Sequence, residues 1–314
     1  MRIRGLTKTF DSITALDGVD LDVGDDELLV VLGATGAGKT TLLRCIAGLE
    51  APDAGTIEMQ RDITRLAPAE RDVALVFQNF SLYPRWSVRR NLEFPLRAPG
   101  RHLGEDEIQK RVDGAAELLR ITPLLDRPAT CLSGGEMQRV AIGRAIVRRP
   151  KIFLMDEPLT NLDAKLRESL RVELVQLRRE LKTPMIFVTH DQAEALSTAD
   201  RIVVLSRGRV LQSGTPEEIY RRPKTPEVAR QLGQPAINLL NRNGKIMGVR
   251  PEDIAIDGGE KEGVVKVVED MGPTQTLLVE WEGAEVHIVA PKTVSVKPGD
   301  RIRPRVNDHN VIMF

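Results

Sequence analysis

Residues 33–40 read Gly-Ala-Thr-Gly-Ala-Gly-Lys-Thr, and this stretch decides the fold of the chain. It matches the phosphate-binding loop pattern, in which a glycine, four residues and Gly-Lys are followed by Ser or Thr. Residues 28–32 before it are all apolar and predict a strand that is buried on both faces. Residues 41–47 after it contain strong helix formers and no breaker. A strand, a glycine-rich turn and a helix are the context that this phosphate site requires.

The residue types in the loop suit a bound phosphate chain. Gly33, Gly36 and Gly38 are expected to take positive φ angles, which turn backbone N–H groups toward an anion. The helix that follows directs its partial positive charge at the same point. Lys39 adds a charge for the β- and γ-phosphates, and the hydroxyl of Thr40 can bind Mg²⁺. The alternative, a glycine-rich turn that fits the pattern by chance, leaves the flanking strand and helix unexplained.

Size and composition are those of a soluble globular protein. The 314 residues are enough for one large domain and a smaller one. The chain has 45 Lys and Arg against 45 Asp and Glu, a balance that argues mildly against a nucleic-acid partner. No apolar run approaches the roughly 18 residues of a membrane span, and the start lacks the apolar core of a signal peptide. Cys45 and Cys131 have neither disulfide nor metal spacing, so a reducing cytosol is the expected compartment.

Two further layers are predicted around the phosphate loop. Val19, Leu21 and Val23 alternate with polar residues or glycine, which indicates an antiparallel sheet with one face in water. From about residue 87 to 149 the apolar residues follow helical spacing, which indicates a helical insertion in an α/β core. Phe10 lies in a polar neighbourhood, so it is either a minor core contact or a surface on which a base stacks.

Polar residues stand where three further predicted strands end. These strands cover residues 73–77, 152–155 and 185–189, and the polar residues at their ends are Gln78, Asp156, Glu157 and His190. Parallel strands end at the same edge of a sheet, where open α/β sheets bind ligands. We therefore expect these residues to converge with Gly33 on one site.

The carboxylates at this edge suit metal-assisted hydrolysis. Asp156 stands where a strand delivers a carboxylate to the water shell of Mg²⁺. Glu157 can accept a proton from an attacking water. Adjacent carboxylates beside phosphates would repel each other without a metal, so Mg²⁺ is part of the hypothesis. His190 is either a structural hydrogen bonder or a ligand contact, and its position at this edge favours the contact.

Residues 132–136, Leu-Ser-Gly-Gly-Glu, lie inside the helical insertion. Ser133 and Glu136 are spaced as a capping box, which would open a helix over residues 136–148. A cap does not account for Gly134 and Gly135, because consecutive glycines disfavour a helix. They leave bare N–H groups at a helix N-terminus. Together with the Ser133 hydroxyl, these groups predict a second anion site.

The last third of the chain has a different pattern. Three prolines in the charged segment between 221 and 235 indicate a linker. Beyond it, short alternating strands are predicted at residues 264–268, 276–279, 286–289 and 301–306. Such strands indicate a small β-barrel or sandwich, and no catalytic constellation occurs among them.

Together these motifs resemble those of the ATPase subunits of ATP-binding-cassette (ABC) transporters. Residues 33–40, Gln78, residues 132–136, Asp156-Glu157, residues 160–163 and His190 occur in the order and approximate spacing of that family. Each motif is a weak signal, but the combination is very specific and covers essentially the whole chain. The resemblance implies an α/β fold: a P-loop (RecA-like) nucleotide-binding core with antiparallel β and helical subdomains, plus a small C-terminal OB-like β-barrel. The implied domains are 1–232, with the helical subdomain at about 87–149, and 233–314.

The resemblance also implies cofactors and roles for single residues. ATP and Mg²⁺ are the implied cofactors, with Glu157, His190 and Gln78 as catalytic residues and Thr40, Gln78 and Asp156 at the metal. The implied nucleotide-binding residues are Phe10, stacked on adenine, with Gly33, Ala34, Thr35, Gly36, Ala37, Gly38, Lys39, Thr40 and Thr41. Two identical or homologous subunits would meet head to tail, so that Ser133, Gly134, Gly135 and Glu136 of one touch the nucleotide of the other. Asp163 would lie in the loop at this dimer interface.

Aromatic residues are few in this chain, at 4%, but they concentrate after Gln78. Phe77, Phe80, Tyr83 and Trp86 either fill the core of the helical insertion or form an exposed docking surface. Polar neighbours in the same segment favour the exposed surface. The resemblance places the groove for a permease's cytoplasmic helix here, so Phe80, Tyr83 and Trp86 are the predicted docking residues.

Residues 234–240 and 248–253 resemble importer ATPases of the maltose and glycerol-phosphate type, whose appended OB-like domain is regulatory. Two features depart from that pattern: Glu136 replaces the usual Gln, and the appended domain is short for the sugar group.

The expected function is ATP hydrolysis that drives uptake of a small solute, such as a sugar, a polyol or a glycerol-phosphate-like compound. The expected partners are a second ATPase subunit, two membrane permease subunits and, indirectly, an extracytoplasmic solute-binding protein, without nucleic acid. The subunit would be peripheral at the cytoplasmic face of the plasma (inner) membrane. Polyamines, iron and oxyanions are alternative solutes. A cassette acting on DNA or ribosomes, an export cassette and a metabolic P-loop kinase are rival classes that fit the motifs less well.

Overall fold

The computed structural model describes residues 1–160, 162–242 and 244–314. Two compact units, Met1–Ser213 and Gly214–Phe314, make up the chain. Asn161, one residue of the motif at 160–163, lies outside the described residues. No helix within the described ranges has the length and apolar character to span a membrane.

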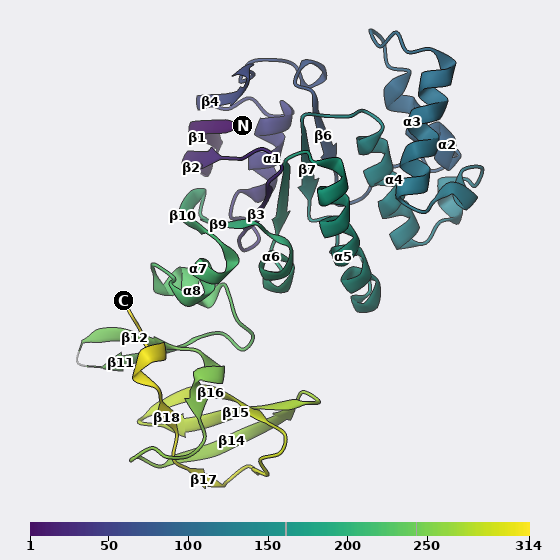
Figure 1. The fold of residues 1–314 in the computed structure, drawn as a ribbon. Helices are drawn as coiled ribbons and strands as arrows, with labels where there is room; N and C mark the ends of the chain where they lie inside the picture. The colour runs from purple at the N-terminus through teal and green to yellow at the C-terminus, as the bar shows by residue number, and fades with distance from the viewer. Residues whose placement is uncertain (161, 243) are drawn as a thin grey trace. The chain divides into compact units, whose positions relative to one another are not determined.

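A parallel sheet with an antiparallel strand at one edge forms the centre of the N-terminal unit (Figure 1). Its strand order is β10-β9-β3-β8-β7-β6, and every residue of the central strands β3, β7 and β8 is buried. Continuous apolar runs therefore predicted the buried parallel strands correctly. The strands are β3 (Leu28–Leu32), β6 (Val73–Val76), β7 (Ile152–Asp156), β8 (Met185–Thr189), β9 (Arg201–Ser206) and β10 (Arg209–Gly214).

A second, antiparallel sheet lies in the same unit, in the order β2-β1-β4-β5. Val19 and Leu21 on β2 and Val23 just after it are buried, while Asp20 and Asp22 between them are exposed. The predicted alternation of buried and wet positions is thus confirmed. The strands are β1 (Arg2–Phe10), β2 (Ile13–Asp22), β4 (Ala54–Met59) and β5 (Arg61–Asp62).

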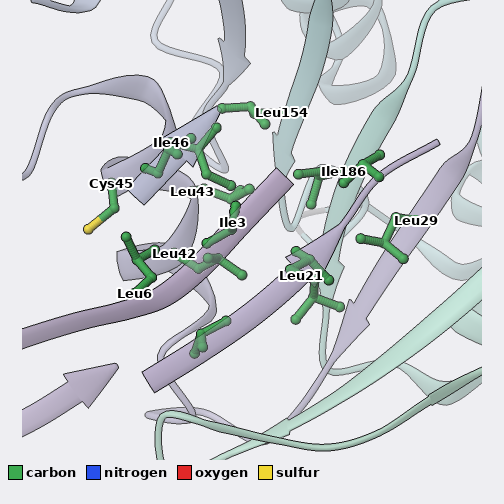
Figure 2. Packing of buried hydrophobic residues seen from close by; sticks show 14 of the residues in the cluster. Ile3, Leu6, Leu21, Leu29, Leu42, Leu43, Cys45, Ile46, Leu154 and Ile186 are labelled. Atoms are coloured by element: carbon green, nitrogen blue, oxygen red, sulfur yellow. The ribbon is translucent and has the colours of Figure 1, made fainter. Parts of the chain in front are cut away.

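Helix α1 (Lys39–Ala47) packs between these two sheets (Figure 2). Leu42, Leu43 and Ile46 on the helix are at most 1% exposed. They belong to the same cluster as Ile3 and Leu6 of the antiparallel sheet, and as Leu29, Leu154 and Ile186 of the parallel sheet. This core fixes the position of the turn that precedes α1.

The remaining helices of this unit form two groups. The helical insertion contains α2 (Val88–Glu93), α3 (Glu105–Leu118) and α4 (Gly134–Ile146), which contact one another (Figure 1). Helix α6 (Gln192–Thr198) packs on β3 and β8, and α5 (Ala164–Leu181) packs on α6. Helix α4 begins two residues before the predicted start at 136, because both glycines adopt helical geometry behind the Ser133 cap.

The C-terminal unit is largely β, as predicted, and the strands among its described residues form three small sheets. Its strands are β11 (Asn238–Arg242), β12 (Lys245–Val249), β13 (Ile254–Ala255), β14 (Gly263–Asp270), β15 (Thr274–Trp281), β16 (Ala284–Pro291), β17 (Arg301–Ile302), β18 (Arg305–Val306) and β19 (Ile312–Met313). Leu277, Val279, Val286 and Ile288 form the centre of its core, each 0% exposed.

Two short helices also belong to this unit, α7 (Pro216–Arg221) and α8 (Pro226–Arg230). The two compact units divide before these helices, at 213/214, whereas the domain boundary expected from the sequence lies after them, at 232/233. The segment 221–235, predicted to be a linker, contains α8. Its prolines do not break the helix because Pro226 occupies the first helical position, where proline is tolerated.

Arg250 holds these helices on the β unit. Its side chain is 3% exposed and donates to the carbonyls of Tyr220, Ala229 and Leu232, which lie at the ends of α7 and α8. The guanidinium also lies over the Tyr220 ring, 4.0 Å from its centroid. Last-turn carbonyls lack helical partners, and this arginine satisfies them.

We expect Arg250→Met to destabilise the C-terminal unit by about 2–4 kcal/mol, because buried carbonyls lose charged donors. Thermal unfolding, together with hydrogen exchange of residues 216–232, measures the effect. Arg301→Met is the control, since Arg301 is exposed and forms a surface pair with Glu262 at 3.2 Å. Equal melting of the two variants would contradict the role assigned to Arg250.

Candidate functional site

The carboxyl ends of four parallel strands meet at one edge of the sheet, as the sequence predicts. In the order β3-β8-β7-β6, these strands lead to the loop at 33–38, to His190, to Glu157 and to Gln78. The register keeps the ends level, with Leu32 beside Thr189 and Val76 beside Met155. Residues from distant parts of the sequence are thus brought to one site.

The glycines of the loop serve two different purposes. Gly36 and Gly38 have φ angles of 81° and 104°, as predicted. The prediction for Gly33 is wrong, because its φ is not positive; a Cβ at this position would lie 2.4 Å from the carbonyl oxygen of Leu205. Gly38 faces a similar restriction, since its Cβ would lie 2.3 Å from the carbonyl of Ala15. Close backbone packing therefore requires glycine at both ends of the loop.

Lys39 is held inside the loop. Its side chain is 5% exposed, and Nζ donates to the carbonyls of Gly33 at 2.8 Å and Ala34 at 3.1 Å. Nζ also lies 3.4 Å from Oε1 of Glu157. The ammonium group is therefore already positioned at the mouth of the loop, where it can exchange these partners for phosphate oxygens.

Thr40 and Asp156 lie together beside Lys39. The Thr40 hydroxyl donates to Oδ1 of Asp156 at 3.1 Å. Burial is the main cause that raises the pKa of Asp156, and the neighbouring Glu157 raises it further, while the Thr40 hydrogen bond lowers it. A hydroxyl and a carboxylate are ligands that Mg²⁺ accepts, since this ion takes one or two carboxylates together with waters and phosphate oxygens. The pair fits such an ion.

Glu157 is the centre of a polar cluster at the end of β7. Nδ1 of His190 lies 3.1 Å from Oε2 of Glu157, and the Thr160 hydroxyl donates to the same oxygen at 3.3 Å. The backbone of Glu157 has a φ of 43°, in the left-handed region that non-glycine residues seldom adopt. A strained residue at the site is typical of functional positions, where surrounding contacts fix one conformation.

The sequence interpretation missed the residues that support His190. The Thr189 hydroxyl, 0% exposed, donates to Oε2 of Glu194 at 2.6 Å and accepts from the N–H of Asp191 at 2.9 Å. Asp191 in turn caps α6 by accepting from the N–H groups of Ala193 and Glu194. These contacts fix the turn in which His190 sits. The S/T/D-plus-Glu pattern at 189–194 is the signal that could have identified it.

Phe10 and Gln78 are both exposed on the surface of the N-terminal unit. Phe10 ends β1 with 40% of its surface exposed, and Nζ of Lys8 lies 5.1 Å from its ring centroid. The minor core contact is therefore the weaker interpretation. Ile13 pairs with Phe10 across β1 and β2 and is 69% exposed, so a wide apolar surface is available at this hairpin.

The capping box predicted at residues 133–136 is formed, while the anion site predicted there stays a prediction. The N–H of Ser133 donates to the carboxylate of Glu136 at 2.7 Å, and the N–H of Glu136 donates to the Ser133 hydroxyl at 3.4 Å. The hydrogen bond from the Ser133 N–H is the main cause that lowers the pKa of the Glu136 carboxylate. A Cβ at Gly135 would lie 2.7 Å from the side chain of Leu166, so a larger residue there would require this side chain to move. Asp163 caps α5 by accepting from the N–H of Leu166 at 2.9 Å.

The predicted docking surface needs one correction. Phe80 is 8% exposed and therefore buried, so it does not belong to an exposed cluster. Phe94, which the sequence interpretation missed, takes its place: its ring centroid lies 4.9 Å from that of Tyr83 and 5.6 Å from that of Trp86. Tyr83 and Trp86 stack at 4.1 Å. We call Tyr83, Trp86 and Phe94 the aromatic cluster.

The arrangement is that of a P-loop ATPase, in which a loop that can hold phosphates lies beside a carboxylate that can activate water. A family model described as ABC transporter matches residues 16–160, and one described as TOBE domain matches residues 247–314. The chain belongs to the ABC transporter family, as one of its ATP-hydrolysing subunits.

Relatives match over most of the chain. The sn-glycerol-3-phosphate import ATP-binding protein UgpC 2 of Rhizobium johnstonii is 43% identical over 95% of this chain and 92% of its own. The sn-glycerol-3-phosphate import ATP-binding protein UgpC of Rhizobium meliloti is 48% identical, over 82% and 80% of the two chains.

Solved structures agree on the fold. A component of an ABC transporter complex from Clostridium perfringens has a TM-score of 0.65 and 31% identity over 72% of this chain and 92% of its own. A dimeric bacterial ABC transporter cassette has a TM-score of 0.61 and 30% identity over 68% of this chain and 98% of its own.

Glu157→Gln should retain ATP binding while hydrolysis falls by at least ~10²-fold, because the amide cannot accept the proton of the attacking water. Nucleotide binding and phosphate release by the purified variant measure the two effects. Glu173→Gln is the matched control, since Glu173 pairs with Arg139 on the α4–α5 contact. Hydrolysis at the wild-type rate in Glu157→Gln would show that another group activates the water.

Proposed function

We propose that this subunit powers the uptake of sn-glycerol 3-phosphate, or a closely similar phosphorylated polyol, through separate permease subunits. The observation that carries the proposal is the identity of 42–48% to import ATP-binding proteins of that name, over most of both chains. The protein's own residues support the part of the proposal that concerns ATP hydrolysis.

The proposed nucleotide is ATP with Mg²⁺, the ion that would neutralise phosphate charge during hydrolysis. Lys39 would hold the terminal phosphates by leaving its present carbonyl partners. Thr40 and Asp156 would hold the ion, and Gln78 would approach it from the end of β6. Glu157 would take the proton of the attacking water, and His190 would orient Glu157 through their 3.1 Å contact. Phe10 would stack on the adenine.

A second ATPase subunit, identical or homologous, is the proposed partner at the nucleotide. Ser133, Gly134 and Gly135 present a hydroxyl and bare N–H groups at the start of α4, which suit a phosphate. Asp163 lies at the start of α5, next to the Leu166 side chain on which Gly135 packs. One subunit would thus complete the site of the other, and a dimeric structure is known for a related cassette.

Two permease subunits are the proposed partners at the aromatic cluster, and an extracytoplasmic solute-binding protein would act through them. Tyr83 is 38% and Phe94 is 45% exposed, and Arg90 lies over the Trp86 ring at 4.2 Å. Aromatic side chains rimmed by polar groups are typical of binding surfaces. With such partners, the subunit would lie at the cytoplasmic face of the plasma (inner) membrane.

The complex of this chain with its permease subunits and solute-binding protein tests the proposed solute. We expect sn-glycerol 3-phosphate to stimulate its ATP hydrolysis, and ³²P-labelled solute to enter proteoliposomes in an ATP-dependent manner. Maltose, spermidine, ferric iron and phosphate are the comparison solutes. Stimulation by one of these, with no response to sn-glycerol 3-phosphate, would replace the proposed solute and keep the importer assignment.

Trp86→Ala should weaken assembly with the permease by ~2 kcal/mol or more, the scale of an aromatic hot spot. Co-purification with the permease and ATP affinity of the free subunit are the two measurements, and ATP affinity should hardly change. Val172→Ala is the control, because Val172 is an exposed apolar residue on α5, at 52%. Normal co-purification of Trp86→Ala would contradict the docking surface.

A further inference from the structure

Residues 80–87, which carry two members of the aromatic cluster, contain an unusual turn. Phe80 and Ser81 have φ angles of 61° and 48°, so two consecutive non-glycine residues are left-handed. Such residues are disfavoured and persist where surrounding contacts hold them. The turn follows Gln78 directly, and it leads into the aromatic cluster.

Arg144 of helix α4 holds this turn. Its Nη1 donates to the carbonyl of Ser81 at 2.7 Å, and its Nη2 donates to the carbonyl of Phe80 at 3.0 Å. No carboxylate pairs with Arg144 among the residues that the structure describes, and burial is the main cause that lowers its pKa. A partly buried cation without a counter-ion is unfavourable unless its hydrogen bonds compensate. The carbonyl groups of Phe80 and Ser81, the two residues with left-handed backbone conformation, supply these hydrogen bonds.

Other contacts tie the same loop to the opposite end of α4. The N–H of Thr130 donates to the carbonyl of Pro84 at 3.1 Å, and that of Ala129 donates to the carbonyl of Trp86 at 3.0 Å. These donors lie a few residues before the Ser133 cap. Asn91 on α2, 0% exposed, bonds both the N–H and the carbonyl of Tyr83. The loop is therefore attached near both ends of the helix.

We propose that Arg144 is a positioning residue that makes the loop 80–87 and helix α4 move as one body. A displacement of the aromatic cluster then reaches Ser133 at the start of α4, which is about 16 Å from Arg144 along a helix of this rise. Arg144 touches neither the phosphate loop nor the carboxylates of β7, so it acts on the coupling between the sites. The inference rests on the proposed function for its physiological meaning.

Arg144→Gln removes the charge and the fork that reaches two carbonyls, while Arg144→Lys keeps one charged donor. In the assembled transporter we expect Arg144→Gln to lower solute-stimulated ATP hydrolysis at least 5-fold. Basal hydrolysis and ATP affinity of the free subunit should stay within 2-fold of wild type. Arg144→Lys should be intermediate.

Arg111→Gln is the matched control. Arg111 also donates to a carbonyl near the end of α4, that of Val147 at 3.5 Å, and it pairs with Glu107 on its own helix. Arg111→Gln removes contacts within the same group of helices, α2, α3 and α4, but none with residues 80–87. If Arg144 had a purely structural role, Arg144→Gln would lower basal hydrolysis, stimulated hydrolysis and the melting temperature together. Either that result or full stimulation in Arg144→Gln would overturn the proposal.

Hydrogen exchange of the free subunit tests the attachment without any solute. The amides of Phe80, Ser81 and Tyr83 should exchange at least 10-fold faster in Arg144→Lys than in wild type, and those of α5 should not change. Unchanged exchange at these amides would refute the attachment. If sn-glycerol 3-phosphate does not stimulate ATP hydrolysis by the wild-type complex, that result would count against the proposed function. The exchange result would still test the attachment of the loop to α4.

Discussion

The burial of helix α1 between two sheets is the constraint on which the rest of the structure depends. Leu42, Leu43 and Ile46 are buried against both sheets, and each contributes about 1.5–3 kcal/mol on the usual scale for such side chains. A helix packed on two sides cannot rotate or slide without exposing one of its apolar faces. The N-terminus of α1 is therefore fixed at the carboxyl edge of the parallel sheet. The phosphate loop, which leads directly into α1, is held in place with it.

Fixing the loop in this way concentrates unfavourable features at the same edge. Glu157 is held in a left-handed conformation, and burial raises the pKa of Asp156, so its charged form is disfavoured in the folded protein. Stability from Asp156 therefore falls as the pH rises through its folded pKa. A cation bound at the proposed site would reverse this balance, because it would favour the ionised carboxylate. Cation binding would then also stabilise the N-terminal unit.

Much of this could be predicted from the sequence, because the strongest signals are local. A continuous apolar run followed by Gly, Asp-Glu or His gives both a buried strand and the polar residue at its end. Gly33 shows the limit: its glycine is required by the carbonyl of Leu205, which lies far away in the sequence and carries no local signal. Phe80 and Phe94 show the same limit, because aromatic spacing does not tell which ring faces the core. The contacts of Arg250 with α7 and α8 are also long-range, so no local signal predicts that these helices pack on the C-terminal strands.

Three arginines show how this chain solves a recurring problem of unpaired carbonyls. Arg71 donates to Cys45 and Ile46 at the end of α1, Arg250 serves the ends of α7 and α8, and Arg144 serves the turn at 80–81. Each uses the guanidinium fork to reach carbonyls at helix ends or in a turn, where regular structure supplies few donors. A lysine also has several N–H donors, but they all lie on one nitrogen and lack the fixed planar geometry of the guanidinium fork. The fork therefore does more than satisfy polar atoms: it fixes the angle between the segments that it joins. The turn that Arg144 holds against α4 lies between the end of β6 and the aromatic cluster, and this placement is what the proposed coupling role of Arg144 requires.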